Sequence, residues 1–226
     1  MSFLDKDQRW ATHYGITLDL ADSAVETACS LNDAAAVRRL SEEVLSHAAS
    51  SDDRLNSLYA VTKSLRLVFK FMDAKKVAFT MLEQLGESLP RPSDDSGLIA
   101  NLQEMRNVLQ NMSDESILNL QETNQTKRDT LLMNLYHDLN FLFQFVDTKR
   151  IADCSLRMVE VTMMNGLCCM SPVAFAQFAI ILVKNEDFAL GYRLGTLSLR
   201  LIEKINAQRY TSAVIALVGH LISWVA

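Results

Sequence analysis

Histidine and cysteine are the residue types of this chain best suited to chemistry, and neither is arranged for it. The four histidines, His13, His47, His137 and His220, all lie inside segments with helical periodicity. A catalytic Ser or Cys needs a nearby His and a carboxylate, usually on loops or strand ends. Asp138 follows His137 directly, but neighbouring residues on a helix point about 100° apart and do not form a catalytic pair. The sequence therefore predicts no catalytic residue and no enzyme activity.

The adjacent cysteines Cys168 and Cys169 raise the question of a metal or redox site. Zinc sites use Cys-x-x-Cys or similar spacing, whereas adjacent cysteines on a helix diverge. Within "VTMMNGLCCMSP" the pair stands among methionines, which is typical of soft, adaptable core packing. With Cys29 and Cys154 also in helical patterns, we expect buried, reduced thiols in a cytoplasmic protein, with no metal and no cofactor.

The segment "NEDFALGYRLGTL" (185–197) places Gly191 and Gly195 one turn apart in a predicted helix. Glycine costs about 1 kcal/mol relative to alanine in a helix interior, so the pair requires an explanation. No Lys-Ser or Lys-Thr follows, which excludes a phosphate-binding loop. Because Arg193 lies between the glycines, a membrane dimer face is also excluded. We expect the helix over 172–184 to pack closely against both glycines, with Tyr192 at the contact.

An aromatic group near the N-terminus has two interpretations. Trp10, His13 and Tyr14 follow helical spacing, and aromatic side chains on a surface often mark a binding hot spot. The same spacing is more typical of an N-terminal helix that seals its neighbour. We therefore assign Trp10 and Tyr14 to packing.

Composition points to a soluble all-α protein. Apolar residues make up 49% of the 226 residues and charged residues 22%, with a net charge of -5 and no basic cluster suited to nucleic acid. Seven glycines and three prolines are too few for a turn-rich β fold. The N-terminus does not resemble a signal peptide, and the apolar run from Tyr210 to Ala226 is too short and too polar for a membrane span.

The periodicity predicts helix pairs in a single domain over 1–226, with a loop at 90–97 that contains Pro90 and Pro92. "DAAAV" (33–37) returns as "DAKKV" (73–77) and "DTKRI" (147–151), and Asp187 occupies a similar place, although recurring Asp caps could also be coincidence. Stacked antiparallel pairs would form a tetratricopeptide-like α-solenoid. The predicted caps are Asp33, Asp73, Asp147 and Asp187, and the predicted pairs cover about 10–49, 53–89, 98–120 (irregular), 128–165 and 172–205, with an unpaired last helix at 208–225.

The order of several segments resembles a known family. These are "WATHYGITLDLADSAVETACSLNDAAAVRRLSEEVLSHA" (10–48), "LGESLP" (85–90), "SDESILNL" (113–120), "SPVAFAQFAIILVKNEDFALGYRLGTLSLRLIEKINA" (171–207) and "HLISWV" (220–225). They are similar to the tetratricopeptide-like helical region of large signalling ATPases, where a STAND-type predicted NTPase follows a Ser/Thr kinase-like domain and GAF and histidine-kinase domains often come afterwards. Two departures affect turns: "QETNQ" (121–125) stands where the family has a proline and a further Asp-Pro, and Glu186–Asp187 stands where it often has Gly-Asp.

The resemblance implies a non-catalytic interaction and regulatory module, either a fragment or a relative of the region between the NTPase and output domains. No catalytic residue of the family falls within this chain. The implied partner is a protein or a neighbouring domain of the same chain, and the apolar last helix suggests self-association. The alternative is a small-molecule-sensing helical domain with an apolar pocket near Met163, Met164, Phe175 and Phe178.

Overall fold

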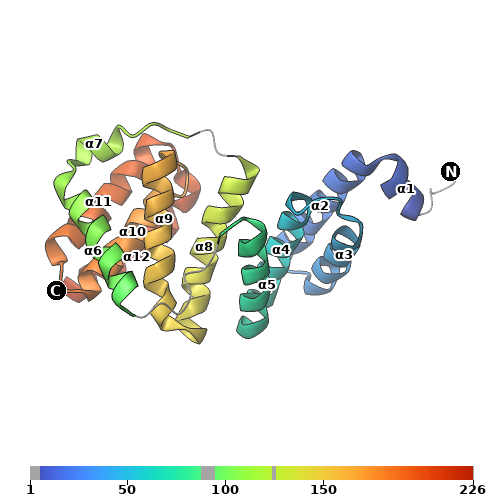
Figure 1. Cartoon of the computed structure of the whole chain (residues 1–226), viewed down its shortest axis with the longest axis horizontal. Helices are drawn as coiled ribbons and strands as arrows, with labels where there is room; N and C mark the ends of the chain where they lie inside the picture. Colours follow the sequence, from blue (N-terminus) through green and yellow to red (C-terminus); the bar gives the residue numbers. More distant parts are fainter. Residues whose placement is uncertain (1–5, 88–94, 124–125, 226) are drawn as a thin grey trace. The chain divides into compact units, whose positions relative to one another are not determined.

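The computed structural model of the chain describes residues 6–87, 95–123 and 126–225. The described residues contain twelve α-helices, three short 3-10 helices and no strand, which confirms the all-α prediction (Figure 1). They form two compact units, Met1–Leu89 and Pro90–Ala226, rather than the single domain that the sequence predicts. The boundary falls where the Pro- and Ser-rich loop was predicted at 90–97. Residues 90–94 of that loop lie outside the described residues, and a helix begins at Asp95.

The first unit consists of five α-helices, of which α2, α3 and α4 share a buried apolar cluster. Val25, Ala28, Val37 and Ala60 pack together as a buried cluster of small side chains. Because these side chains are small, α2, α3 and α4 can approach closely. The helices are α1 (Lys6–Thr12), α2 (Tyr14–Ser30), α3 (Ala34–His47), α4 (Leu55–Leu67) and α5 (Phe71–Gln84), with the 3-10 helix η1 (Asp52–Arg54) before α4.

The second unit has a larger and more aromatic core. Tyr136, Phe143, Phe175 and Phe178 are fully buried. Helix α10 is buried along most of its length and packs against α9, α11 and α12. The helices are α6 (Asp95–Asn111), α7 (Asp114–Leu118), α8 (Lys127–Val146), α9 (Ile151–Asn165), α10 (Ser171–Lys184), α11 (Phe188–Lys204) and α12 (Thr211–Val225), with the 3-10 helices η2 (Thr148–Arg150) and η3 (Gln208–Tyr210).

The same tight turn ends five helices. In each, a residue with positive φ lies two positions after the helix, and two backbone N–H groups bond back to the last turn. At the end of α10, for example, Glu186 N donates to Val183 O and Asp187 N donates to Leu182 O. This is the Schellman arrangement, which satisfies carbonyls that a helix end leaves free. The positive-φ residues are Asn32, Phe69, Gly86, Glu186 and Asn206.

Of the four predicted helix caps, Asp33 and Asp187 cap through their side chains, Asp147 occupies the N-cap position of η2, and Asp73 is wrong. Asp33 accepts a hydrogen bond from Ala36 N, and Asp187 accepts one from Leu190 N. Asp73 lies inside the first turn of α5, whose N-cap is Lys70, because the Schellman turn places the start of α5 three residues earlier. Asp147 makes no capping bond, since its carboxylate accepts instead from Arg150 Nε at 2.8 Å. A Schellman turn precedes Asp33, Asp73 and Asp187 but not Asp147, so neither the turn nor the aspartate cap recurs at all four places.

A short backbone pairing ties residues 121–123 to the end of α9. Leu167 N donates to Gln121 O at 2.8 Å, and Thr123 N donates to Leu167 O at 2.9 Å. Gly166, with φ +97°, makes this approach possible, since a Cβ there would lie 2.2 Å from Gln121 O. The pairing thus fixes residues 121–123 to the end of α9.

Candidate functional site

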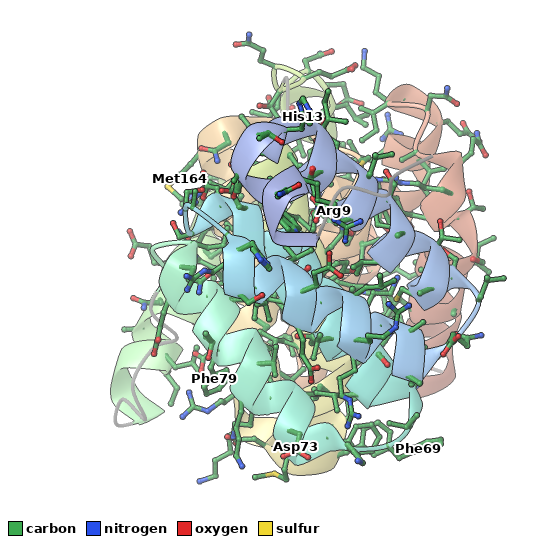
Figure 2. The ribbon with its side chains drawn as sticks, turned by 90° about the vertical axis from the view of Figure 1, so that its right-hand side faces the viewer. Arg9, His13, Phe69, Asp73, Phe79 and Met164 are labelled. Atoms are coloured by element: carbon green, nitrogen blue, oxygen red, sulfur yellow. The ribbon has the colours of Figure 1, made fainter. Side chains whose placement is uncertain are left out.

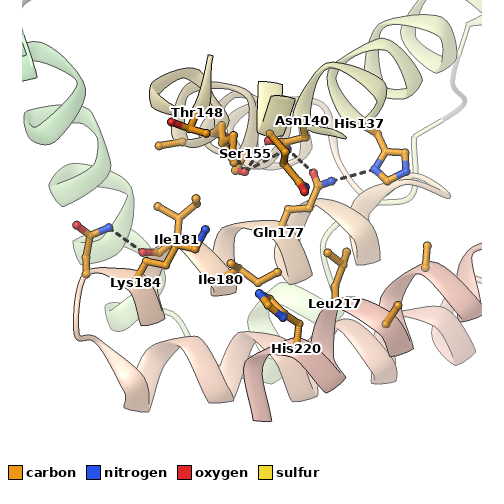
Figure 3. A pocket seen from close by; sticks show the side chains of 16 residues that line it. His137, Asn140, Thr148, Ser155, Gln177, Ile180, Ile181, Lys184, Leu217 and His220 are labelled. Atoms are coloured by element: carbon orange, nitrogen blue, oxygen red, sulfur yellow. Dashed lines mark hydrogen bonds between the residues drawn. The ribbon is translucent and has the colours of Figure 1, made fainter. Parts of the chain in front are cut away.

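A groove of about 830 Å³ opens in the second unit between α8 and α12, with α10 as its floor (Figure 3). Residues of α8, α10 and α12 line the groove, and η2 and the start of α9 close one side of it. Its lining combines aliphatic side chains from α9, α10 and α12 with buried polar side chains from α8, α9 and α10. The lining residues are His137, Asn140, Gln144, Thr148, Ile151, Ala152, Ser155, Gln177, Ile180, Ile181, Lys184, Asn185, Ala213, Ala216, Leu217 and His220.

A hydrogen-bonded chain of buried polar side chains runs along the groove. Asn140 Nδ2 donates to Gln177 Oε1 at 2.7 Å and to Ser155 Oγ at 3.1 Å. Gln177 Nε2 contacts His137 Nδ1 at 2.9 Å, as Figure 3 shows. Asn140, Ser155 and Gln177 are all buried. Buried polar side chains are normally hydrogen-bonded, and these hydrogen bonds fix their orientation.

Two atoms of these hydrogen-bonded side chains can still make a further hydrogen bond. Ser155 has one hydroxyl proton, and Ile151 O at 2.9 Å is a closer acceptor for it than Asn140 Oδ1 at 3.4 Å. Asn140 Oδ1 therefore remains a weakly engaged acceptor. Gln177 Nε2 carries two hydrogens, and the bonds among the described residues use one of them. The groove thus offers a donor and an acceptor next to each other.

The histidines occupy three kinds of site. His13 is exposed at the break between α1 and α2. His47 stacks on Trp10 with the ring centroids 4.9 Å apart. His137 and His220 both line the groove. Within the described part of the chain, no three His, Cys, Asp or Glu side chains are grouped to hold a metal ion.

The cysteines are largely enclosed by the core. Burial raises the pKa of the Cys154 thiol far above its ordinary value, and burial also raises the pKa of Cys168. Both thiols are therefore protonated and poor nucleophiles near neutral pH. Cys169 is half-buried, and its sulfur accepts a hydrogen bond from Arg209 Nη2 at 3.0 Å.

The glycine pair lies against two helices rather than one. A Cβ on Gly191 would come within 2.6 Å of Val183 Cγ2 on α10, as the sequence predicts. A Cβ on Gly195 would instead meet Leu221 Cδ1 of α12 at 2.9 Å. Tyr192 is 61% exposed and takes no part in this contact, because a residue next to Gly191 points away from its face.

Trp10 and Tyr14 lie where α1 and α2 meet the end of α3. Trp10 is buried, and its indole N–H donates to Glu43 Oε1, which also accepts from Arg9 (labelled in Figure 2). Tyr14 OH donates to Asp53 at 2.6 Å and accepts from Ala49 N at 2.7 Å. Both rings join separate segments of the first unit.

Three arginines attach α6 and α7 to α11. Arg193 donates to Asp114 Oδ1 at 2.7 Å and also to the carbonyls of Leu109 and Met112 at the end of α6. Arg200 donates to Asp114 Oδ2 at 3.2 Å and to Glu115. Arg106 of α6 donates to the capping residue Asp187 at 2.5 Å. We call this set the arginine clamp.

The apolar pocket predicted near Met163, Met164, Phe175 and Phe178 does not coincide with the groove. Both phenylalanines are fully buried in the core, Met164 is 64% exposed, and neither methionine lines the groove. One signal in the sequence does point to the groove. Gln177 is the only uncharged polar residue between Pro172 and Lys184, and such a residue in an apolar helix requires a partner.

Comparison with known proteins identifies no relative. No protein-family model, curated protein or solved structure matches the chain. The functional conclusions therefore depend on the groove and on the resemblance described above. Among the described residues, no helix is both long enough and apolar enough to cross a membrane.

Proposed function

We propose that the chain is a non-catalytic, tetratricopeptide-like helical-repeat module that regulates by binding a protein segment. The segment belongs to a partner or to a neighbouring domain, in line with a place between the NTPase and output domains of a signalling ATPase. The observation that carries this proposal is the groove over α10 with its buried amide chain.

The polar lining of the groove suits a peptide main chain. A peptide group presents one donor and one acceptor, and the groove offers Asn140 Oδ1 and a Gln177 N–H. A purely aliphatic ligand would cover these groups without pairing them, which costs about 1–3 kcal/mol for each buried group. The aliphatic lining can bury one or two side chains of the segment at the same time.

Recurring turns support the proposal of stacked helix pairs. Schellman turns join α2 to α3, α4 to α5 and α10 to α11, whereas 3-10 helices precede α4, α9 and α12. In the turn before α11, Glu186 adopts the left-handed conformation that glycine takes readily. The substitution of Glu186 for the glycine of the similar family is therefore compatible with the same turn.

A direct test selects peptides from a random 12-residue library displayed on phage, with the full chain as bait. Ala216 is exposed and lines the groove, so Ala216→Trp fills the groove without disturbing the core. Ile215→Trp is the matched control, because Ile215 lies on the same helix, is 56% exposed and does not line the groove. We expect peptides that bind the wild type and Ile215→Trp but not Ala216→Trp. Peptides that bind all three proteins equally would contradict the proposal.

Small-molecule sensing is the second candidate, because about 830 Å³ falls within the range of small-molecule sites. A thermal-shift screen against a metabolite set distinguishes the two. A compound that raises the Tm of the wild type but not of Ala216→Trp would favour sensing over peptide binding.

A further inference from the structure

The charged side chains that line the groove limit which protein segments it can bind. Lys184, His137 and His220 are the lining residues that can carry charge, and each can only become positive. Among the described residues that line the groove there is no aspartate or glutamate, although acidic residues outnumber basic ones in the sequence, 27 to 22. A positively charged side chain entering the groove would find no carboxylate among these lining residues.

Lys184 stands at one end of the groove, after the last aliphatic residues of the α10 floor. It is exposed, and no ion pair engages it within the described part of the chain. The acidic residue that caps the next helix, Asp187, is held by Arg106 and Leu190 N. The ammonium group of Lys184 therefore remains available to a ligand.

Aliphatic side chains line the same groove as this cation. Ile180 and Ile181 come from α10, Leu217 comes from α12, and Ile151 comes from the start of α9. Figure 3 shows Lys184 next to Ile181, with Ile180 between them and Leu217. An aliphatic side chain of a ligand would lie against this surface, and a carboxylate near it in sequence would lie near Lys184.

We infer that the groove selects protein segments in which an aliphatic side chain is close in sequence to an acidic side chain, and that it rejects basic segments. This inference rests on the proposed function, because it names the chemistry of the segment that the groove binds. A carboxylate at Lys184 gains a charge-assisted bond, whereas a basic side chain meets like charge.

The test repeats the phage selection on the wild type and on Lys184→Glu, with Lys149→Glu as the matched control. Lys149 is exposed in η2 and does not line the groove, so its substitution changes the net charge equally. Circular dichroism verifies that each variant is folded. We expect wild-type peptides enriched in Leu or Ile together with Asp or Glu. This acidic preference should be lost in Lys184→Glu and kept in Lys149→Glu.

The strongest synthetic peptide from the wild-type selection then gives affinities by fluorescence anisotropy. Replacing its acidic residue by Gln should weaken binding at least about fivefold, and replacing it by Lys at least about twentyfold. Against Lys184→Glu the order of the acidic and Lys peptides should reverse.

The outcomes separate the two proposals. Peptides that need the open groove but show no acidic preference, or whose preference survives in Lys184→Glu, would overturn the charge inference and leave the proposed function standing. A selection that yields no peptide sensitive to Ala216→Trp would overturn both.

Discussion

Two regions of the second unit differ in how completely their polar side chains are paired within the chain. Where α6 and α7 lie against α11, charged side chains are matched within the chain, as in the pairing of Arg193 with Asp114. In the groove over α10, Asn140 and Gln177 pair with each other and still keep capacity for another partner. The arginine clamp therefore pairs charged groups within the chain, and the groove keeps the donor and the acceptor on which the proposed binding depends. The predictions below test this difference, from the largest expected effect to the smallest.

Removing the conformational freedom of Gly166 should have the largest effect. A Cβ at this position would lie 2.2 Å from Gln121 O, and φ is +97°. The Gly166→Ala variant must break the pairing of residues 121–123 with Leu167, and we expect a loss of more than about 3 kcal/mol in the free energy of unfolding. Urea denaturation measures it. Gly219→Ala is the control, since nothing lies within 4 Å of a Cβ there.

Breaking the arginine clamp should have the next largest effect on the free energy of unfolding. Arg193→Met leaves Asp114 and the carbonyls of Leu109 and Met112 without this donor, so we expect a loss of about 2–3 kcal/mol. The more exposed Arg200→Met should cost about 0.5 kcal/mol. Equal losses for the two variants in urea denaturation would show that the burial and the carbonyl contacts of Arg193 do not matter.

The close packing at Gly191 leaves no room for a methyl group, so Gly191→Ala should destabilise the protein. In Gly191→Ala the new Cβ would lie 2.6 Å from Val183 Cγ2 and 3.0 Å from Ala179 O, and overpacking of this kind costs about 1–3 kcal/mol. Differential scanning calorimetry should show a lower Tm than for the wild type. A Tm equal to that of Gly219→Ala would refute the close approach of α10 and α11.

The turn before α11 should be improved by glycine. Glu186 has φ +66°, which costs an L-residue about 1 kcal/mol and glycine almost nothing. Glu186→Gly should therefore raise the free energy of unfolding by about 0.5–1 kcal/mol. Lys184→Gly, at an exposed residue of α10, should instead lower the free energy of unfolding. If both variants were destabilised to the same extent, the turn geometry would be incorrect.

Filling the groove should have the smallest effect on stability. Ala216 is exposed to open space in the groove, so Ala216→Trp should change the free energy of unfolding by less than about 0.5 kcal/mol. A loss comparable to that of Gly191→Ala would mean that this position is part of the packed core.

Local chemistry made parts of the fold predictable from the sequence. The scarcity of Gly and Pro predicts the all-α class, and the close packing at Gly191 follows from its cost inside a helix. Asp33 caps its helix as predicted because capping depends on residues three positions apart. Asp73 misled the prediction, since backbone bonds at Phe69 and Lys70 determine where α5 begins.

The groove and the arginine clamp were not predictable in the same way. Asn140 and Gln177 are 37 residues apart, and Arg193 and Asp114 are 79 apart, so their meeting depends on how helices pack. Only Gln177, as a polar residue in an apolar helix, gives a local sign of the site.

The most direct test of the binding role observes the groove amides themselves. A groove-dependent peptide from the phage selection is titrated into the ¹⁵N-labelled full chain, and NMR follows the side-chain NH₂ signals of Asn140 and Gln177 and the Nε–H signal of Arg193. We predict that the Asn140 and Gln177 signals shift with the occupancy of the peptide while the Arg193 signal stays in place. Binding that shifts Arg193 and leaves both groove amides unchanged would contradict the assignment of the groove as the binding site.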